Sequence, residues 1–106
     1  MLKIKIAEEF SDSVGTRYIS EGEYSGEEFR ESLLKPKFKE AVEKECKLTV
    51  DFDGGYGYPT SFLEEAFGGL VRNSTYGKKD ILSRLDFISE DETSLIDTIK
   101  EYINNA

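Results

Sequence analysis

The chain has 106 residues, the size of one compact domain, and its 22 acidic and 14 basic residues give it a net charge of −8. This excess of negative charge argues against nucleic acid and against an anionic membrane surface as partners, because both are bound by concentrated Lys and Arg. The chain contains no histidine, which excludes the Ser-His-Asp triad, histidine general bases and histidine-ligated zinc.

The cysteine content indicates the compartment. Cys46 is the one cysteine, so an internal disulfide is excluded and a reducing cytoplasm is favoured. No apolar run approaches the roughly 20 residues that span a bilayer, and the first residues alternate too strictly for a signal peptide. We therefore expect a single cytoplasmic domain over residues 1–106 that binds no cofactor.

The first part of the chain predicts strands and a helix. Leu2, Ile4 and Ile6 alternate with lysines, which is typical of a strand with one buried face. Thr16–Ser20 reads as a short second strand. Ser25 is followed three residues later by Glu28, the capping-box pattern that begins a helix.

Pro36 predicts a boundary between two helices in this region. Lys35 precedes Pro36, and a residue before proline is disfavoured in helical geometry, so we expect the first helix to end there. Pro36 then suits the first turn of a second helix, in which Phe38 and Ala41 face the core.

The central stretch predicts a strand, a tight loop and a helix. Leu48, Val50 and Phe52 alternate with polar residues, and Asp53 and two glycines then end the strand. After a loop rich in Gly and Tyr, Ser61 and Glu64 form another capping box, so the sequence places Ser61 at the N-cap of a helix.

The last part of the chain predicts one more strand and helix. Arg84–Ile88 carries Leu85 and Phe87 on one face, and Ser89 with three following acids indicates a helix start. The whole pattern favours an α/β layered domain, with helices packed on a mixed or parallel sheet of about four strands. The core should include the following side chains: Phe52, Phe67, Leu70 and Ile99.

Two levels of family resemblance follow from these motifs. The strand, loop and helix from Val50 to Leu63 resemble those of STAS domains, the anti-sigma-factor-antagonist fold, in which a helix opens with an Asp-Ser-Ser-Gly-like motif. Segments SGEEFRESLLKP, VDFDGG and SFLEEAFGGLV resemble more closely the bacterial STAS-like family, domain of unknown function 4325. The resemblance implies a STAS-like fold and a regulatory role.

The STAS motif also implies a phosphorylation site. Its second Ser accepts a phosphate, and in an ungapped alignment Ser61 takes that position, with Thr60 on the preceding Ser. Pro59 replaces the Asp of the motif and Phe62 replaces the Gly. Two interpretations of Ser61 are open, a helix cap and a phosphoacceptor that switches binding. The resemblance further implies a protein partner, namely an ATP-binding kinase-like regulator.

The loop and the first turn of its helix are the candidate contact surface, because ligands and partners gather at the carboxyl ends of strands in α/β sheets. The partner-binding candidates are Tyr56, Tyr58, Pro59, Thr60 and Glu64. Arg17 and Arg30 are candidates for binding an anion, against the alternative that they lie on solvated surface among acidic neighbours.

A catalytic alternative uses the acids at the end of the central strand. Asp51 and Asp53 resemble the Asp-x-Asp motif of haloacid-dehalogenase-type phosphotransferases and share a face that could hold Mg²⁺. Glu8 and Glu9 with Asp53 give a related receiver-type alternative, for which no suitable later Lys is found. We expect the domain to have no catalytic residues, with a small Mg²⁺-dependent phosphotransferase or hydrolase as the alternative.

Overall fold

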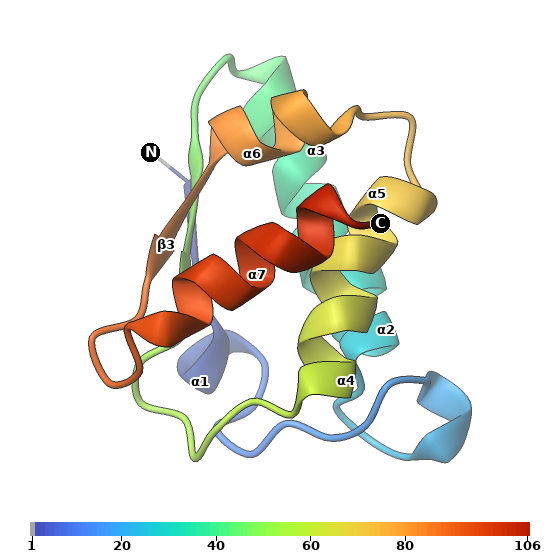
Figure 1. Ribbon diagram of the computed structural model, residues 1–106, viewed down its shortest axis with the longest axis vertical. Helices are drawn as coiled ribbons and strands as arrows, with labels where there is room; N and C mark the ends of the chain where they lie inside the picture. Colours follow the sequence, from blue (N-terminus) through green and yellow to red (C-terminus); the bar gives the residue numbers. More distant parts are fainter. Residues whose placement is uncertain (1) are drawn as a thin grey trace.

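The computed structural model describes residues 2–106 and contains a three-stranded parallel sheet. The strands are β1 (Leu2–Lys5), β2 (Leu48–Asp51) and β3 (Leu85–Ile88), in the order β1-β2-β3. All four residues of β2 are buried, because β2 is the middle strand and lies between β1 and β3. Figure 1 shows the strands on one side of the molecule, with α7 running from near their lower ends across the middle of the molecule. The α/β class is confirmed, with three parallel strands rather than about four.

Each connection between strands carries helices, as parallel pairing requires. The first contains α1 (Ile6–Glu9), η1 (Ile19–Glu21), α2 (Gly26–Phe29), η2 (Arg30–Leu34) and α3 (Lys35–Glu43). The second contains α4 (Thr60–Leu63), η3 (Glu64–Gly68), α5 (Gly69–Arg72) and α6 (Lys78–Arg84). The last helix, α7 (Ser94–Asn104), follows β3 and packs against η3.

The predicted strand at Thr16–Ser20 is wrong. The carbonyls of Thr16 and Arg17 accept hydrogen bonds from the main-chain N–H groups of Gly26 and Glu27, at 2.8 and 3.0 Å. The segment therefore satisfies the free N–H groups in the first turn of α2, instead of pairing with the sheet. Ser25 does cap this helix as predicted, since its Oγ accepts from the N–H of Glu28 at 3.0 Å.

The predicted break before Pro36 is also wrong. Lys35 has helical angles (φ −65°, ψ −47°), and the helix runs on through the proline. The turn before it, η2, is a π-helical turn, in which the Lys35 N–H donates to the Arg30 carbonyl five residues earlier. The wide turn also shifts the buried face by one residue, so that Leu34 rather than Leu33 lies with Phe29 in the core.

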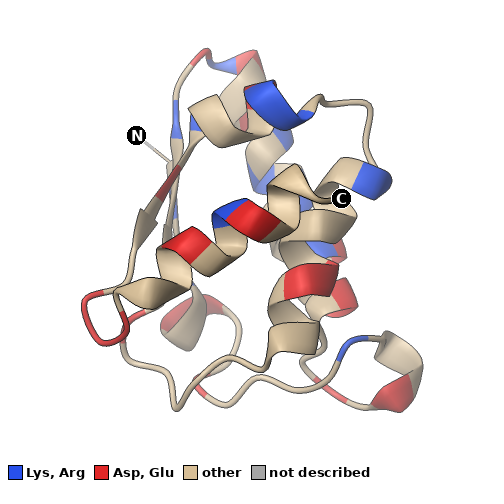
Figure 2. Ribbon diagram, viewed as in Figure 1, with Lys and Arg blue, Asp and Glu red and all other residues tan. Residues whose placement is uncertain are grey.

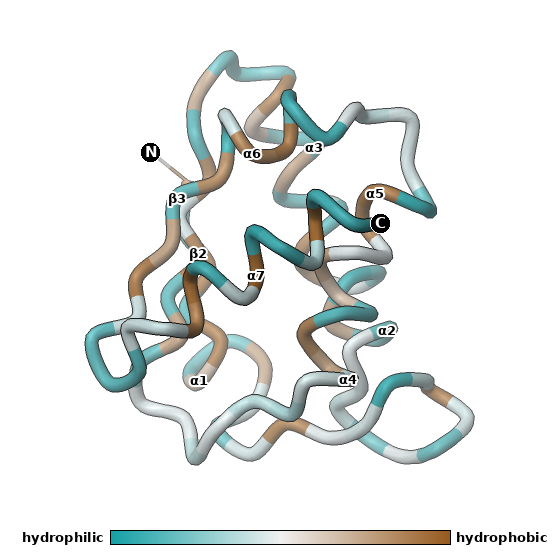
Figure 3. Tube along the Cα trace, viewed as in Figure 1, coloured by the Kyte–Doolittle hydropathy of each residue, from teal (hydrophilic) through white to brown (hydrophobic). Residues whose placement is uncertain are grey.

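The core lies between the sheet and the helices, where the hydrophobic positions of these elements meet (Figure 3). The four predicted core residues are all buried: Phe52, Phe67, Leu70 and Ile99. The final helix begins at Ser94, later than the Ser89 start predicted, because the backbone of residues 90–91 is engaged elsewhere. Within residues 2–106, no helix has both the length and the apolar character needed to cross a membrane.

Candidate functional site

The three strands end together at one edge of the sheet, which we call the carboxyl edge. Lys5, Asp51 and Ile88 are neighbours in register across the strands, so the segments that follow them converge. Partners and ligands of α/β domains gather at such an edge. The loop after β2 and the loop after β3 both lie there, at the lower end of the strands in Figure 1.

Reciprocal hydrogen bonds from two aspartates hold these two loops together. The Asp53 carboxylate accepts from the N–H groups of Glu90 and Asp91, at 3.1 and 3.0 Å. The Asp91 carboxylate accepts in return from the N–H of Gly54 at 3.1 Å. Gly54 has a φ of 90°, a conformation that favours glycine. Asp53 therefore fixes the shape of the edge.

The other acid of the Asp-x-Asp pattern is engaged as well. One oxygen of Asp51 accepts from the N–H of Asp53 at 2.9 Å, and the other lies 3.6 Å from the Nζ of Lys3. Throughout residues 2–106 there is no group of three or more Asp, Glu or Cys side chains that could hold a metal ion. The geometry thus gives both aspartates structural contacts and offers no support for the phosphotransferase alternative.

The two loop tyrosines have different surroundings. Tyr58 packs edge-on against the Phe52 ring, and its hydroxyl donates to the Phe52 carbonyl at 2.8 Å. The side chain of Tyr56 is 86% exposed, while its main-chain N–H donates to the Asp12 carbonyl at 2.8 Å. Tyr58 therefore anchors the loop on the core, and Tyr56 is held out in solvent by an anchored backbone.

A small pocket opens between these loops, with a volume of about 180 Å³. Phe52 and Leu95 contribute its apolar part, and Tyr56, Asp91 and Glu92 contribute polar groups. The acids after β3 were not predicted as site residues. The signal that could have found them is their position directly after a parallel strand, since such positions meet at one edge.

The buried and acidic surroundings of Tyr58 should raise the pH at which its hydroxyl ionises. Burial, and then the charges of Asp51, Asp53 and Asp91, raise the pKa of Tyr58 from 10.0 to about 12. Because the folded pKa lies above the unfolded one, its contribution to stability is complete below pH 10 and is lost as pH rises toward 12. In a tyrosinate absorbance titration, we expect wild type to have one late-ionising tyrosine that Tyr58→Phe lacks. Identical late phases in both proteins would contradict this placement.

The start of α4 differs from the prediction for Ser61. The helix begins at Thr60 with Pro59 as its N-cap, and no side chain caps it. Ser61 is therefore not the cap but the second residue of the helix, where it is half-buried beside the exposed Pro59 and Thr60. Ser61 thus forms no capping box, and Glu64, the other residue of the predicted box, is bound by arginines instead.

Glu64 belongs to a cluster of ion pairs on the flank of α4 and η3. Its carboxylate accepts from Arg17 at 2.5 Å and from Arg72 at 2.6 Å. The hydrogen bonds from Arg72 and then Arg17 lower the pKa of Glu64, against the opposing effect of partial burial. Glu64 is one of the predicted partner-binding candidates, and in the free domain its carboxylate is already occupied by Arg17 and Arg72.

Arg30 joins this cluster through Glu65 and is buried, so the alternative of a solvated Arg30 is wrong. It is 4% exposed, and its Nη1 donates to the Glu65 carboxylate at 2.7 Å and to the Glu65 carbonyl at 2.8 Å. Arg17 lies 3.3 Å from the same Glu65 carboxylate. Carboxylates of this chain thus already engage both predicted anion-binding arginines.

Two consecutive helical glycines leave room for these side chains. A Cβ on Gly69 would lie 2.3 Å from the Nη1 of Arg30, and one on Gly68 would lie 2.6 Å from the Oε2 of Glu64. The glycines cost about 1 kcal/mol each in helix propensity. Gly69 allows the guanidinium of Arg30 to lie directly against the helix backbone, and Gly68 makes room for the Glu64 carboxylate.

Comparison with known proteins agrees with this architecture. Residues 25–95 match the family described as STAS-like domain of unknown function (DUF4325). The matched region includes both π-helical turns, the strands β2 and β3 and the carboxyl-edge loops. No curated protein and no solved structure matches the chain. Because the match covers more than half of its residues, the chain belongs to the STAS-like DUF4325 family.

Proposed function

We propose that this domain is a non-catalytic regulatory module of the cytoplasm that binds another protein through its carboxyl edge. The contact surface, which we call the edge surface, comprises the loop 54–60, Ser61, and the acids Asp91 and Glu92. The observation that carries the proposal is Tyr56, a tyrosine 86% exposed beside a pocket on an anchored loop. Rigid exposed tyrosines suit protein contacts because they bury much area at little entropic cost.

The size of the pocket favours a protein over a small molecule. Its volume of about 180 Å³ is below the range of about 300–1,000 Å³ that is usual for small-ligand sites. It is suited instead to one side chain of a partner. Tyrosine rings and the carboxylates of Asp91 and Glu92 would attract a Lys or Arg side chain.

Ser61 is the proposed switch within the edge surface. It lies in the first turn of a helical segment whose first main-chain bond is from the Leu63 N–H to the Pro59 carbonyl, at 3.2 Å. The N–H groups before Leu63 and the helix dipole would stabilise a phosphate there. By its kinship with STAS domains, we propose an ATP-binding kinase-like regulator as the partner that phosphorylates Ser61.

Replacement of Tyr56 tests the surface. A partner captured from the native cell with the wild-type domain is purified and titrated by calorimetry against wild type and Tyr56→Ala. We expect Tyr56→Ala to weaken binding by at least about 2 kcal/mol, or roughly 30-fold in Kd, because a central tyrosine would be truncated.

The matched control is Tyr18→Ala, which removes a tyrosine that is 46% exposed on a different loop. It should bind as tightly as wild type. Equal affinities for wild type and Tyr56→Ala would contradict the proposed surface.

A further inference from the structure

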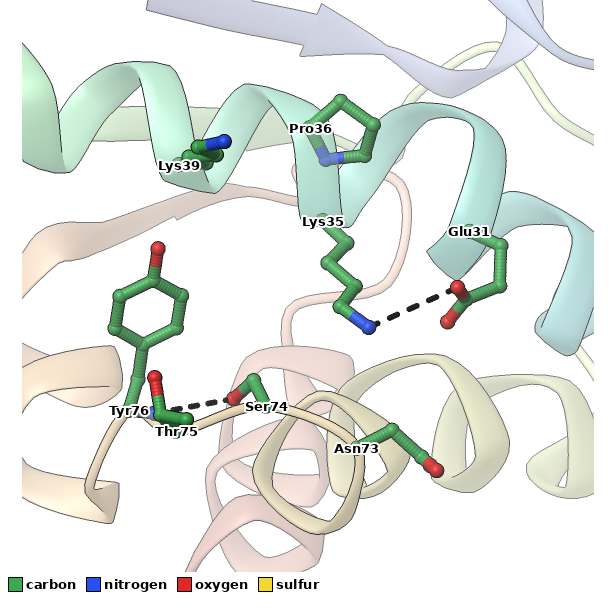
Figure 4. Close-up of a pocket in the computed structure, with 8 residues that line it drawn as sticks. All are labelled: Glu31, Lys35, Pro36, Lys39, Asn73, Ser74, Thr75 and Tyr76. Carbon is green, nitrogen blue, oxygen red and sulfur yellow. Dashed lines mark hydrogen bonds and ion pairs between the residues drawn. The ribbon is translucent and has the colours of Figure 1, made fainter.

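A larger hollow lies away from the carboxyl edge, between the start of α3 and the loop joining α5 to α6. We call it the α3 groove. Its volume is about 540 Å³, within the usual range of about 300–1,000 Å³ for small-ligand sites. One wall consists of Glu31, Lys35, Pro36 and Lys39, and the other is the loop 73–76 (Figure 4). It shares no residue with the edge pocket.

The loop wall is held in place by its own contacts. The Asn73 amide donates to the Gly69 carbonyl at 3.0 Å, and the Ser74 hydroxyl donates to the carbonyl of Leu70. The Tyr76 N–H donates to the Ser74 hydroxyl at 3.3 Å, and the Tyr76 ring lies 4.9 Å from that of Phe38. A wall fixed in advance lowers the entropic cost of binding a ligand.

The groove is basic although the protein is acidic. Its charged lining residues are Lys35, Lys39 and Glu31. The segments that continue from its walls, 35–47 and 72–84, hold nine of the 14 basic residues and four of the 22 acidic ones. Figure 2 shows Lys and Arg on α3, at the end of α5 and at the start of α6. Anions would therefore be attracted to this part of the surface and repelled from most of the rest.

The ammonium groups of the two lysines that line the groove, Lys35 and Lys39, make few ion pairs within the described part of the chain. The Nζ of Lys35 lies 3.7 Å from Glu31, and these side chains are 38% and 44% exposed, so this pair is weak. Lys39 makes no salt bridge with any residue in the described part of the chain, unlike Lys37 and Lys44. In Figure 4 the Lys35 side chain extends from the helix into the space beside the loop.

We propose that the α3 groove binds a small organic anion, namely a carboxylate or phosphate group carried on an apolar ring. Lys35 and Lys39 bind the anionic group, because they are the cations lining the groove and their donors are largely free. Pro36 and the Tyr76 ring provide apolar contact for the ring of the ligand. When the ligand binds, the Lys35 ammonium leaves its weak ion pair with Glu31 and pairs with the anionic group of the ligand instead.

A titration followed by amide NMR tests this site on the full chain. The probes are naphthoate, naphthyl phosphate and neutral naphthol, which share a ring system and differ in charge. We expect at least one of the two anions to shift the signals of residues 73–76 saturably, with naphthol binding more weakly at the same signals. A preference between the two anions identifies the acid group that the site takes.

The variant Lys39→Gln removes one ammonium group from the groove, and Lys37→Gln makes the same change on the same helix outside it. We expect Lys39→Gln to weaken the binding anion by about tenfold, as for one lost charge-assisted hydrogen bond, and Lys37→Gln to leave it unchanged. No saturable shift with either anion, equal binding of naphthol, or equal effects of the two variants would overturn the proposal.

Discussion

Replacing Phe67 by alanine is expected to lower the free energy of unfolding by about 3–5 kcal/mol. Phe67 is fully buried, and its ring packs within 6.2 Å of the rings of Phe29, Phe52 and Phe87. Truncation would remove a contact shared by the sheet and two helical segments. Because a typical domain is stable by only about 5–15 kcal/mol, Phe67→Ala should melt far below wild type in urea or on heating.

The matched control is Tyr56→Ala, which truncates an aromatic side chain that is 86% exposed. Such surface changes usually stay within about 0.5 kcal/mol. A Phe67→Ala protein that melted cooperatively within a few degrees of wild type would contradict the position of η3 in the core.

Breaking the ion pair between Arg30 and Glu65 should have a similarly large effect. Both residues are buried, 4% and 6% exposed, and their charged groups are 2.7 Å apart. Removal of one partner takes away the shortest charged contact of the other, which stays buried, and breaking a buried pair in this way costs about 3–5 kcal/mol. Arg30→Met and Glu65→Met should each be destabilised to this extent in chemical unfolding.

The double variant Arg30→Met/Glu65→Met is the control for this pair. The double variant leaves neither of the two buried charges in the interior, so its loss of stability should be much smaller than the sum of the single losses. Arg30 also contacts Glu31, and Glu65 also contacts Arg17, so some loss should remain. Strictly additive losses would show that the pair is not coupled as the structure indicates.

The periodicity of the sequence predicts most of the sheet and the core correctly. Alternating apolar residues identify β1 and β2, and Leu85 with Phe87 identifies β3. Such patterns report burial on one face, which a short segment determines by itself. The segment Thr16–Ser20 is not a strand, because the carbonyls of Thr16 and Arg17 accept hydrogen bonds from the first turn of α2. These bonds depend on where α2 lies in the fold, which the segment's own sequence does not determine.

The helices show where local rules are insufficient. The proline rule predicts a break at Lys35, yet the helix continues from the π-helical turn η2 through Pro36. The capping-box rule places Ser61 at the N-cap, yet Arg17 and Arg72 bind the Glu64 that the box requires. Arg17 is distant from Glu64 in sequence, so no local pattern reveals that contact.

The candidate site was predicted in part. The loop between β2 and α4 does lie at the carboxyl edge, and its Tyr56 is exposed there. The alternative of a solvated Arg30 is wrong because it rests on acidic neighbours along the chain, whereas the fold buries Arg30 against Glu65 and beside Gly69. Asp91 and Glu92 join the site only through the parallel alignment of β2 and β3.

Ser61→Asp tests the proposed regulatory function most directly, by a thermal melt and by partner affinity in calorimetry. An acid in the first turn of a helix is favourable, so the melt should match or slightly exceed that of wild type. The affinity should fall at least about 100-fold, because a carboxylate would be buried in the contact without a mate. Ser61→Ala should keep both properties, since the Ser61 side chain caps nothing. The control is Ser83→Asp, which adds the same charge at an exposed residue of α6, at the end of the sheet opposite the carboxyl edge. This variant should bind the partner as tightly as wild type. If Ser61→Asp binds the partner as tightly as wild type, the edge surface is not switched at Ser61.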